Sequence, residues 1–306
     1  MTRFGTVLSR ALLSAALIVP MAALAEPVTF ETADGPMDLA ETPKTIAAYD
    51  FGAIDTLVAM GHVPAGVPAP VYIESLKGPL ADVPAIGSLF EPDYEALAAM
   101  QPDLVIVGSR SVKQQPDLEK LAPVANMSMS ADAIGDGLAR IEAYGQLFGE
   151  PEKAAQLEAD ITAKLEEAKA VVAEKGGKAL IVLTNGPKVA AYGSGSRFGW
   201  LHDALGWPQA VENLDVATHG EAVSFEFIAE ANPDTLIVVD RAAAIQSDAQ
   251  NGHDTLNNEL VQSTNAWKTG RVIYVPAAEM YISTGGYHSI MDTLQSVIDG
   301  LEGQGN

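Results

Sequence analysis

Residues 94–110, YEALAAMQPDLVIVGSR, and residues 225–241, FEFIAEANPDTLIVVDR, share one pattern. Each segment places a glutamate, Glu95 or Glu226, seven positions before a Pro-Asp pair, and the stretch between them suits a short helix. Each then continues into an apolar run that suits a strand buried on both faces, and each ends with an arginine eight residues after the proline. An internal repeat of this kind predicts two related βα units.

The repeat extends upstream of these segments. Residues 47–49 (Ala-Ala-Tyr) precede an expected helix that ends at residues 60–61, and residues 190–192 (also Ala-Ala-Tyr) precede one that ends at residues 205–206. A glycine closes each expected helix, which is a common stop signal. We therefore expect two lobes of similar topology, each with a parallel-type sheet flanked by helices.

A long helix is predicted between the two copies, over residues 151–175. This stretch is rich in strong helix formers, and glycines 176–177 follow it as a stop. At about 1.5 Å per residue it is roughly 37 Å long, enough to run along both lobes as a stiff connection. The prediction is an α/β protein with one lobe over residues 26–150, the linking helix, a second lobe over residues 176–306, and a ligand cleft between the lobes.

Composition limits the classes of function. The 306 residues include 18 lysines and arginines against 40 aspartates and glutamates, a net charge of −22. Nucleic acid is a poor partner for such a chain, because phosphate binding depends on clustered cations. The absence of cysteine excludes disulfides, thiolate metal sites and a cysteine nucleophile, and it predicts that the protein is not a lipoprotein anchored through an N-terminal cysteine.

The first 25 residues have the pattern of a signal peptide. Arg3 and Arg10 precede an apolar run from Ala11 to Ala25 that ends in small residues. This run is shorter than the roughly 20 residues that cross a bilayer, which disfavours a membrane anchor. We expect cleavage near Ala25 and export to the periplasm.

Taken together, these features resemble the helix-spined class of periplasmic substrate-binding proteins that serve ABC importers. Four stretches resemble, more narrowly, the binding proteins for ferric catecholate siderophores: residues 192–199 (YGSGSRFG), 217–220 (ATHG), 238–241 (VVDR) and 280–285 (MYISTG). The resemblance implies a monomeric, non-enzymatic protein without a cofactor. It would capture a ferric siderophore and deliver it to an inner-membrane ABC permease dimer.

Three arginines are the expected ligand-binding residues. Arg110 and Arg241 follow buried strands, and the carboxyl ends of strands face the ligand crevice in open α/β lobes; Arg197 lies in one of the family-like stretches. A ferric catecholate with six phenolate oxygens is trianionic, and the planar guanidinium group can face several oxygens at once. The alternative is that Arg110 and Arg241 pair with surface acids and that Arg197 caps a turn.

His219 and Tyr281 are the expected iron ligands. Both lie in loop-like, glycine-containing sequence, and Fe(III) is a hard acid that accepts phenolate and tolerates imidazole. In the resembling proteins a histidine and a tyrosine at these places complete the iron shell when the siderophore offers only four oxygens. Simple hydrogen bonding is the alternative role for each.

Glu95 and Glu226 are expected to dock the permease, since the resembling family places a glutamate on each lobe for this purpose. A favourable negative charge at a helix start explains both residues equally well.

Rival functions remain open on the sequence. The same fold could bind haem, cobalamin or a bare divalent metal ion, although a site for a bare metal ion would need several histidines and a carboxylate. An exported α/β hydrolase is a remote alternative, because no serine has glycine at both flanking second positions. The glycines at 193, 195 and 199 are spaced one residue too widely for a dinucleotide-binding loop, so they indicate a close approach to the ligand or a tight turn.

Overall fold

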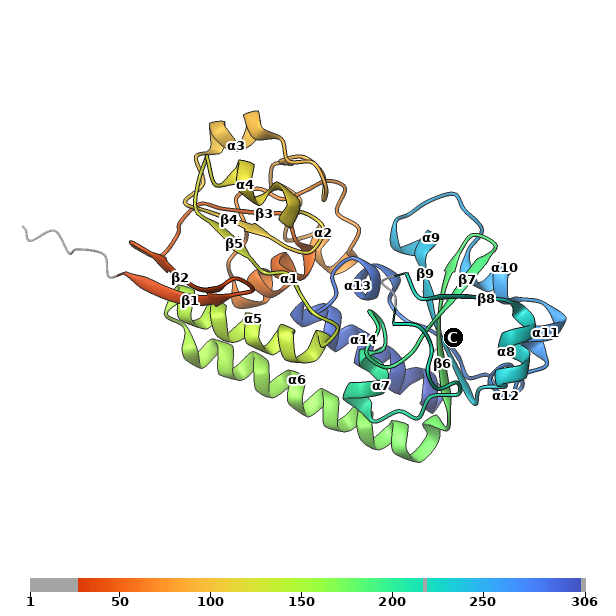
Figure 1. Cartoon of the computed structure of the whole chain (residues 1–306). Helices are drawn as coiled ribbons and strands as arrows, with labels where there is room; N and C mark the ends of the chain where they lie inside the picture. Colours follow the sequence, from red (N-terminus) through yellow and green to blue (C-terminus); the bar gives the residue numbers. More distant parts are fainter. Residues whose placement is uncertain (1–26, 217–218, 304–306) are drawn as a thin grey trace, which may run out of the picture.

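The first lobe contains a small parallel sheet and a hairpin beside it. The computed structural model describes residues 27–216 and 219–303, and Figure 1 shows its arrangement. The hairpin pairs β1 (Val28–Thr32) with β2 (Gly35–Leu39), and the sheet has the order β3-β4-β5. The three sheet strands are β3 (Ile46–Ala48), β4 (Leu104–Val107) and β5 (Val124–Asn126). The lobe's helices are α1 (Phe51–Met60), α2 (Glu74–Lys77), α3 (Tyr94–Met100), α4 (Gln115–Leu118) and α5 (Ala133–Phe148).

The second lobe contains a five-stranded mixed sheet of order β10-β9-β6-β7-β8. Its strands are β6 (Ala179–Asn185), β7 (Lys188–Tyr192), β8 (Glu221–Val223), β9 (Thr235–Asp240) and β10 (Val272–Tyr274). The helices around it are α7 (Trp200–Leu205), α8 (Phe225–Ala231), α9 (Arg241–Ala244), α10 (Gly252–Leu256), α11 (Glu259–Gln262), α12 (Asn265–Lys268), α13 (Ala277–Tyr281) and α14 (Tyr287–Glu302). Strands β6, β9 and β10 are parallel, whereas β7 runs antiparallel to both β6 and β8.

The Pro-Asp repeat is a repeat of structure as well as of sequence. In each copy a seven-residue helix, α3 or α8, ends at a residue in the left-handed conformation, and a buried strand, β4 or β9, follows. The aspartate of each pair then binds the residue that leads into the neighbouring strand. Asp103 accepts hydrogen bonds from the backbone of Lys44 and Thr45 before β3, and Asp234 accepts one from Lys178 before β6. The predicted two related βα units are confirmed.

In the upstream part of the predicted repeat the helix ends are confirmed, at Met60–Gly61 and Leu205–Gly206, but the correspondence of the two Ala-Ala-Tyr stretches is wrong. By these bonds β6, not the strand with the Ala-Ala-Tyr sequence at residues 190–192, corresponds to β3. Asn185 and Lys188 pair across a two-residue turn in which Gly186 has a φ of 56°, and so short a turn can only return the chain antiparallel. The second lobe therefore carries an antiparallel hairpin that the first lobe lacks.

The linking helix is present as predicted and lies along one side of both lobes (Figure 1). Helix α6 (Pro151–Val171) continues as a π-helical turn, Val172–Gly176, and the chain leaves it at Gly177 with a φ of 59°. The residues that α6 and this turn bury fall at helical spacing: Ala154, Leu157, Ile161, Ala168, Val172 and Gly176. They face α5 of the first lobe and α14 and α7 of the second.

The apolar core is continuous across the two lobes. One cluster of buried side chains includes Ile54 of α1, Tyr144 of α5, Ile161 of α6, Ile181 of β6 and Leu294 of α14. Helix α14 packs along α6 and also against α1 of the first lobe. The two lobes are therefore joined by packed helices and not by a flexible strand.

Within residues 27–216 and 219–303, no helix is both long enough and apolar enough to cross a membrane. The predicted signal peptide over residues 1–25 lies outside the described residues.

Candidate functional site

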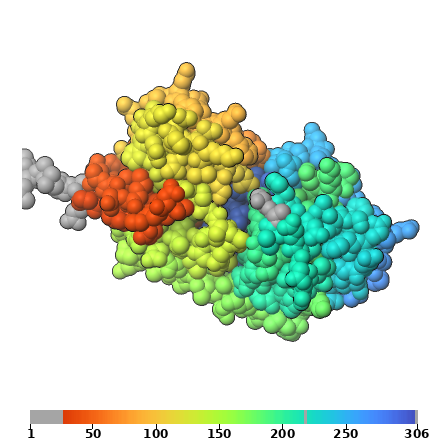
Figure 2. Space-filling view, in the orientation of Figure 1, coloured from red at the N-terminus to blue at the C-terminus, as the bar shows by residue number. Residues whose placement is uncertain are grey.

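The three predicted arginines meet at one tyrosine between the lobes. Arg110 lies three residues beyond β4, Arg241 is the first residue of α9 directly after β9, and Arg197 lies in the loop from β7 to α7. Tyr281 is the last residue of α13. Figure 2 shows a notch between the first lobe, in yellow, and the second, in cyan, with the blue C-terminal part of the chain visible at its floor.

Contacts to Tyr281 come from all three guanidinium groups. Arg110 Nη2 donates to the Tyr281 carbonyl oxygen at 2.7 Å, and Arg197 Nη2 donates to the same oxygen. Arg241 Nε donates to the Tyr281 hydroxyl at 3.2 Å. Their Cζ atoms lie 5.4, 4.6 and 5.9 Å from the centre of the tyrosine ring for Arg110, Arg197 and Arg241, which is cation–π distance. We call these four residues the Tyr281 cluster.

Local hydrogen bonds fix Arg241. The carboxylate of Asp240 caps α9 by accepting from the backbone N–H groups of Ala242 and Ala243, and its second oxygen accepts from Gly252. Asn185, at the carboxyl end of β6, accepts a hydrogen bond from Arg241 Nη1 at 3.2 Å. Asn185 was not predicted, although it follows a buried strand in the same way as the arginines do.

Close packing fixes the Arg110 loop. A Cβ atom on Gly108 would lie only 2.1 Å from Asp50 Oδ2, so the aspartate packs directly on this glycine. Ser111 then closes the turn, because its hydroxyl accepts a hydrogen bond from the Gly108 N–H. Arg110 projects from this turn toward the second lobe.

The glycine-containing loop that carries Arg197 is a tight turn. Asp203 of α7 accepts hydrogen bonds from the Ser194 hydroxyl and from the Gly195 N–H. A Cβ atom on Gly199 would lie 1.9 Å from the Gly193 carbonyl oxygen, so only glycine fits there. Of the two interpretations left open by the sequence, the structure supports a loop that closes on itself.

The electrostatics of the cluster leave positive charge uncompensated. Burial lowers the pKa of Arg197, and the charge of Arg110 lowers it further. Burial alone would raise the pKa of Tyr281, but the hydrogen bond from Arg241 and the three nearby positive charges outweigh it and lower this pKa. Among the described residues, no carboxylate forms an ion pair with any of the three arginines, so the expected alternative of surface acid partners does not hold. The cluster is suited to an anion.

Aromatic rings form one wall beside the cluster. Phe198 is fully buried, its ring centre lies 6.3 Å from that of Tyr281, and Arg197 Cζ lies 4.8 Å from its centre. Tyr192 meets Phe198 edge to face at 4.7 Å. A flat aromatic ligand entering here would meet the cations and the partly exposed ring of Tyr281, beside which the buried Phe198 packs.

His219 lies outside the Tyr281 cluster. It is exposed, in the turn that precedes β8, and within the described residues no hydrogen bond joins it to Tyr281 or to the arginines. The next residue, Gly220, packs against the ring of Tyr192, where a Cβ would lie 2.8 Å from two ring atoms. The backbone beside the histidine therefore lies against Tyr192, whose ring contacts that of Phe198.

Glu95 and Glu226 lie far from the cluster, in the first turns of α3 and α8. Both are exposed, and both helices begin with a side-chain cap, from Asp93 in α3 and from Ser224 in α8. Hydrogen bonds from its own backbone N–H and from the Ser224 hydroxyl lower the pKa of Glu226. Figure 1 shows α3 and α8 on the outer sides of their lobes, away from α13.

A cavity of about 680 Å³ lies elsewhere, beside β10 and the end of α14. Its lining includes Asp240, His253, Tyr274 and Asp299, and it contains no arginine. It offers acidic groups where the Tyr281 cluster offers cations, so it is not the expected ligand site.

Comparison with known proteins assigns the family. Residues 46–279 match the model of a periplasmic binding protein family. The chain is 34% identical to the petrobactin-binding protein YclQ of Bacillus subtilis over 86% of this chain and 84% of that one, and 30% identical to the ferric-anguibactin-binding protein FatB of Vibrio anguillarum over 91% and 89%.

Solved structures agree with this assignment. The crystal structure of YclQ superposes with a TM-score of 0.86 at 31% identity, over 90% of this chain and 99% of that one. The periplasmic catecholate-siderophore binding protein VctP of Vibrio cholerae superposes with a TM-score of 0.81 at 27% identity, over 89% and 99%. The chain belongs to the periplasmic binding protein family.

Proposed function

We propose that this protein is a periplasmic solute-binding protein that captures a ferric siderophore of the catecholate type and delivers it to an inner-membrane ABC permease dimer. The observation that carries the proposal is the convergence of Arg110, Arg197 and Arg241 on Tyr281 from both lobes, without a carboxylate partner among the described residues. Relatives that are named for petrobactin, ferric anguibactin and catecholate siderophores support it.

The charge of the site favours this cargo over the rivals. Three guanidinium groups attract a trianionic ferric complex and repel a bare divalent cation. The partly exposed ring of Tyr281 offers flat apolar surface to a catechol ring, and the buried ring of Phe198 packs beside it. Haem also has carboxylates and a flat ring, so a direct binding measurement must distinguish it from a ferric catecholate.

The proposal includes an exported, monomeric and non-enzymatic protein. Arg3 and Arg10 with the apolar run after them support a signal peptide cleaved near Ala25. The Fe(III)-siderophore complex is then the transported ligand and no cofactor is needed. Glu95 and Glu226, one exposed on each lobe, are the proposed contacts to the two permease subunits.

A titration of intrinsic tryptophan fluorescence tests the proposed ligand class. Trp200 and Trp207 are buried in the second lobe close to the Arg197 loop, so they can report binding. We expect ferric petrobactin and other ferric catecholates to bind in the nanomolar to micromolar range, and ferric citrate, a ferric hydroxamate, haem and Zn²⁺ to bind far more weakly. Preference for haem or Zn²⁺ would refute the proposal.

Tyr281 and His219 are proposed to complete the iron shell of a tetradentate catecholate complex. The lowered pKa of Tyr281 favours the phenolate, which Fe(III) prefers. A hexadentate complex already fills the six positions of the metal. Replacing Tyr281 by Phe and His219 by Ala should therefore weaken binding of a tetradentate complex strongly and that of a hexadentate complex little.

Visible circular dichroism of the charge-transfer band provides the measurement for this prediction. Coordination of the iron by these two side chains should impose a single handedness on the tetradentate complex. The double variant should lose that signal. An unchanged spectrum and affinity in the double variant would show that the arginines alone hold the complex.

A further inference from the structure

An ion pair in the first lobe, Asp50–Arg140, contacts Gly108 in the loop of Arg110 and Gly285 in the segment after Tyr281. We propose that Arg140 is a positioning residue of the binding site, which holds the Gly285 carbonyl against the first lobe and so keeps Tyr281 within reach of Arg110. The effect of Arg140 on ligand capture rests on the proposed function, whereas its effect on the position of Tyr281 can be tested without any ligand.

The contact that Arg140 would maintain joins the two lobes. Arg110 belongs to the first lobe, and Tyr281 belongs to α13, which packs on α9 and β9 of the second. The hydrogen bond from Arg110 to the Tyr281 carbonyl therefore depends on where the segment after α13 runs relative to the first lobe.

Arg140 is placed to control that segment. Its side chain is 2% exposed and extends from α5, with Nη2 donating to the Met127 carbonyl at 2.9 Å. Nη1 donates to the Gly285 carbonyl at 3.4 Å, four residues after Tyr281, and Asp50 Oδ1 lies 3.7 Å from Nη2. A charge buried this deeply must keep its partners, so the guanidinium fixes the position of the carbonyl that it binds.

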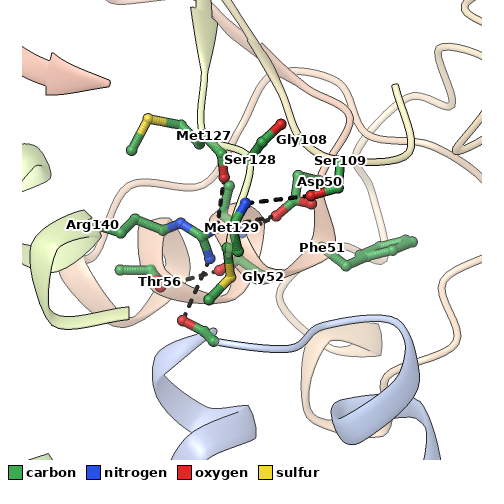
Figure 3. Close-up of polar contacts among 12 residues, drawn as sticks. Asp50, Phe51, Gly52, Thr56, Gly108, Ser109, Met127, Ser128, Met129 and Arg140 are labelled. Carbon is green, nitrogen blue, oxygen red and sulfur yellow. Dashed lines mark hydrogen bonds and ion pairs between the residues drawn. The ribbon is translucent and has the colours of Figure 1, made fainter. Parts of the chain in front are cut away.

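The same ion pair also reaches the Arg110 loop. Asp50 caps α1 by accepting from the Ala53 N–H at 2.8 Å, and its other oxygen packs on Gly108, two residues before Arg110. One member of the pair thus contacts the loop of Arg110, and the other contacts the segment of Tyr281. Figure 3 shows Asp50 and Arg140 close together, with Gly52 and Gly108 on either side.

Glycines permit the close approach of the two lobes here. A Cβ on Gly52 would lie 2.7 Å from the Thr284 carbonyl oxygen and 2.8 Å from Arg140 Nη1. Gly285 has a φ of 75°, and a Cβ there would lie 2.0 Å from Met129 Cε. A side chain at Gly52 would push the Thr284 backbone away from the first lobe, whereas at Gly285 the positive φ favours glycine and the flexible Met129 side chain could move aside.

A second group of bonds holds the start of α14. Asp55 is fully buried and accepts hydrogen bonds from the N–H and the hydroxyl of Ser289, both at 2.8 Å. Ser283 donates to the Phe51 carbonyl at 3.1 Å. The Asp55 bonds anchor the start of α14, and the Ser283 bond limits the movement of the segment itself, so loss of Arg140 should shift residues 281–286 locally without detaching α14.

Ligand-free protein provides the first test. The guanidinium groups of Arg110 and Arg197 lie over the ring of Tyr281, so its ring current should change the chemical shifts of their Nε–H groups. We expect Arg140→Met to move both signals toward the positions that they take in a Tyr281→Leu variant. Gly52→Ala perturbs the same contact from the α1 side and should move both NMR signals in the same direction. It provides a second variant for the test if Arg140→Met does not fold.

Thr235→Val is the matched control. Thr235 is fully buried and donates to the Gly176 carbonyl at 2.8 Å, so this variant also loses a buried hydrogen bond, but far from residues 281–286. It should lower stability and leave the Arg110 and Arg197 signals in place. If Arg140→Met and Gly52→Ala leave these signals where the parent has them, the positioning role is refuted.

Binding of ferric petrobactin provides the second test. Arg140→Met should weaken it roughly tenfold, and the loss should shrink in the Tyr281→Leu background, because coupled residues are not additive. Equal losses in both backgrounds would show that Arg140 acts without Tyr281, and would overturn the proposal. If the NMR signals move but the parent binds no ferric catecholate, the proposed function fails and the positioning role stands.

Discussion

Replacing Arg197 by methionine is expected to weaken binding of the ferric siderophore roughly 10- to 100-fold and to leave the ligand-free protein at least as stable as the parent. The loss of affinity follows from the removal of a charge-assisted hydrogen bond to the anion, about 1.5–3 kcal/mol. The stability follows from the geometry. Arg197 is mostly buried beside Arg110, a like charge, and both lower its pKa. The Tyr281 carbonyl keeps the hydrogen bond from Arg110 when Arg197 is absent.

A loss of affinity without a loss of stability is expected when an arginine serves to bind an anion and not to hold the fold. Fluorescence titration measures the affinity, and thermal unfolding with and without ligand measures the stability. Arg271→Met is the matched control, because it makes the same change of charge just before β10, at the opposite edge of the second sheet. A clear loss of stability in the ligand-free Arg197→Met variant would show instead that this arginine is structural.

Ligand binding should accordingly stabilise the parent more than the variant. A ligand that binds only the folded state adds RT ln(1 + [L]/Kd) to the free energy of unfolding. At equal ligand concentration the parent therefore gains more stability than the variant, because its Kd is lower, and relief of the repulsion between Arg110 and Arg197 is part of that lower Kd. The same comparison separates loss of binding from loss of folding.

The parts of the fold that could be predicted are those in which each residue acts locally. The Pro-Asp pairs were informative because Asp103 and Asp234 bind backbone within one sheet, in the same way in both lobes. The meeting of Arg110 and Arg241 followed from the rule that strand ends face the crevice, which needs only the strands and their direction, whereas Arg197 was placed by resemblance. Tyr281 was placed by resemblance, and the structure puts it at the centre of the trio.

The parts that could not be predicted depend on contacts between distant segments. Arg140 stands out in sequence only as a charge among the buried positions of α5, and its partner Gly285 is 145 residues away. The hairpin of β6 and β7 had a local signal in Asn185-Gly186, but the likeness of the two Ala-Ala-Tyr stretches outweighed it. His219 shows the limit of motif matching, since the structure does not bring it into the Tyr281 cluster.

Reversal of Glu95 and Glu226 to lysine is expected to abolish siderophore-dependent iron uptake in cells and to leave ligand affinity in solution unchanged. Both residues are exposed in the first turns of short helices on the outer sides of the lobes, and neither contacts the Tyr281 cluster. Docking through two glutamates implies positively charged partners on the permease, and two lysines would repel them. The helices should weaken slightly, because a cation opposes the dipole at a helix start.

The control for this prediction must carry the same change of charge elsewhere on each lobe. Glu119 after α4 and Glu212 in the loop after α7 are exposed glutamates that the docking proposal does not use, so the Glu119→Lys, Glu212→Lys double variant makes this change. Uptake of radiolabelled iron, in cells that depend on the plasmid-borne protein, should persist with the control pair and cease with the docking pair. Because both glutamates also suit helix starts, Glu95→Gln and Glu226→Gln separate the two roles: docking through charge predicts that uptake falls, whereas a purely structural role predicts a small loss of stability and normal uptake.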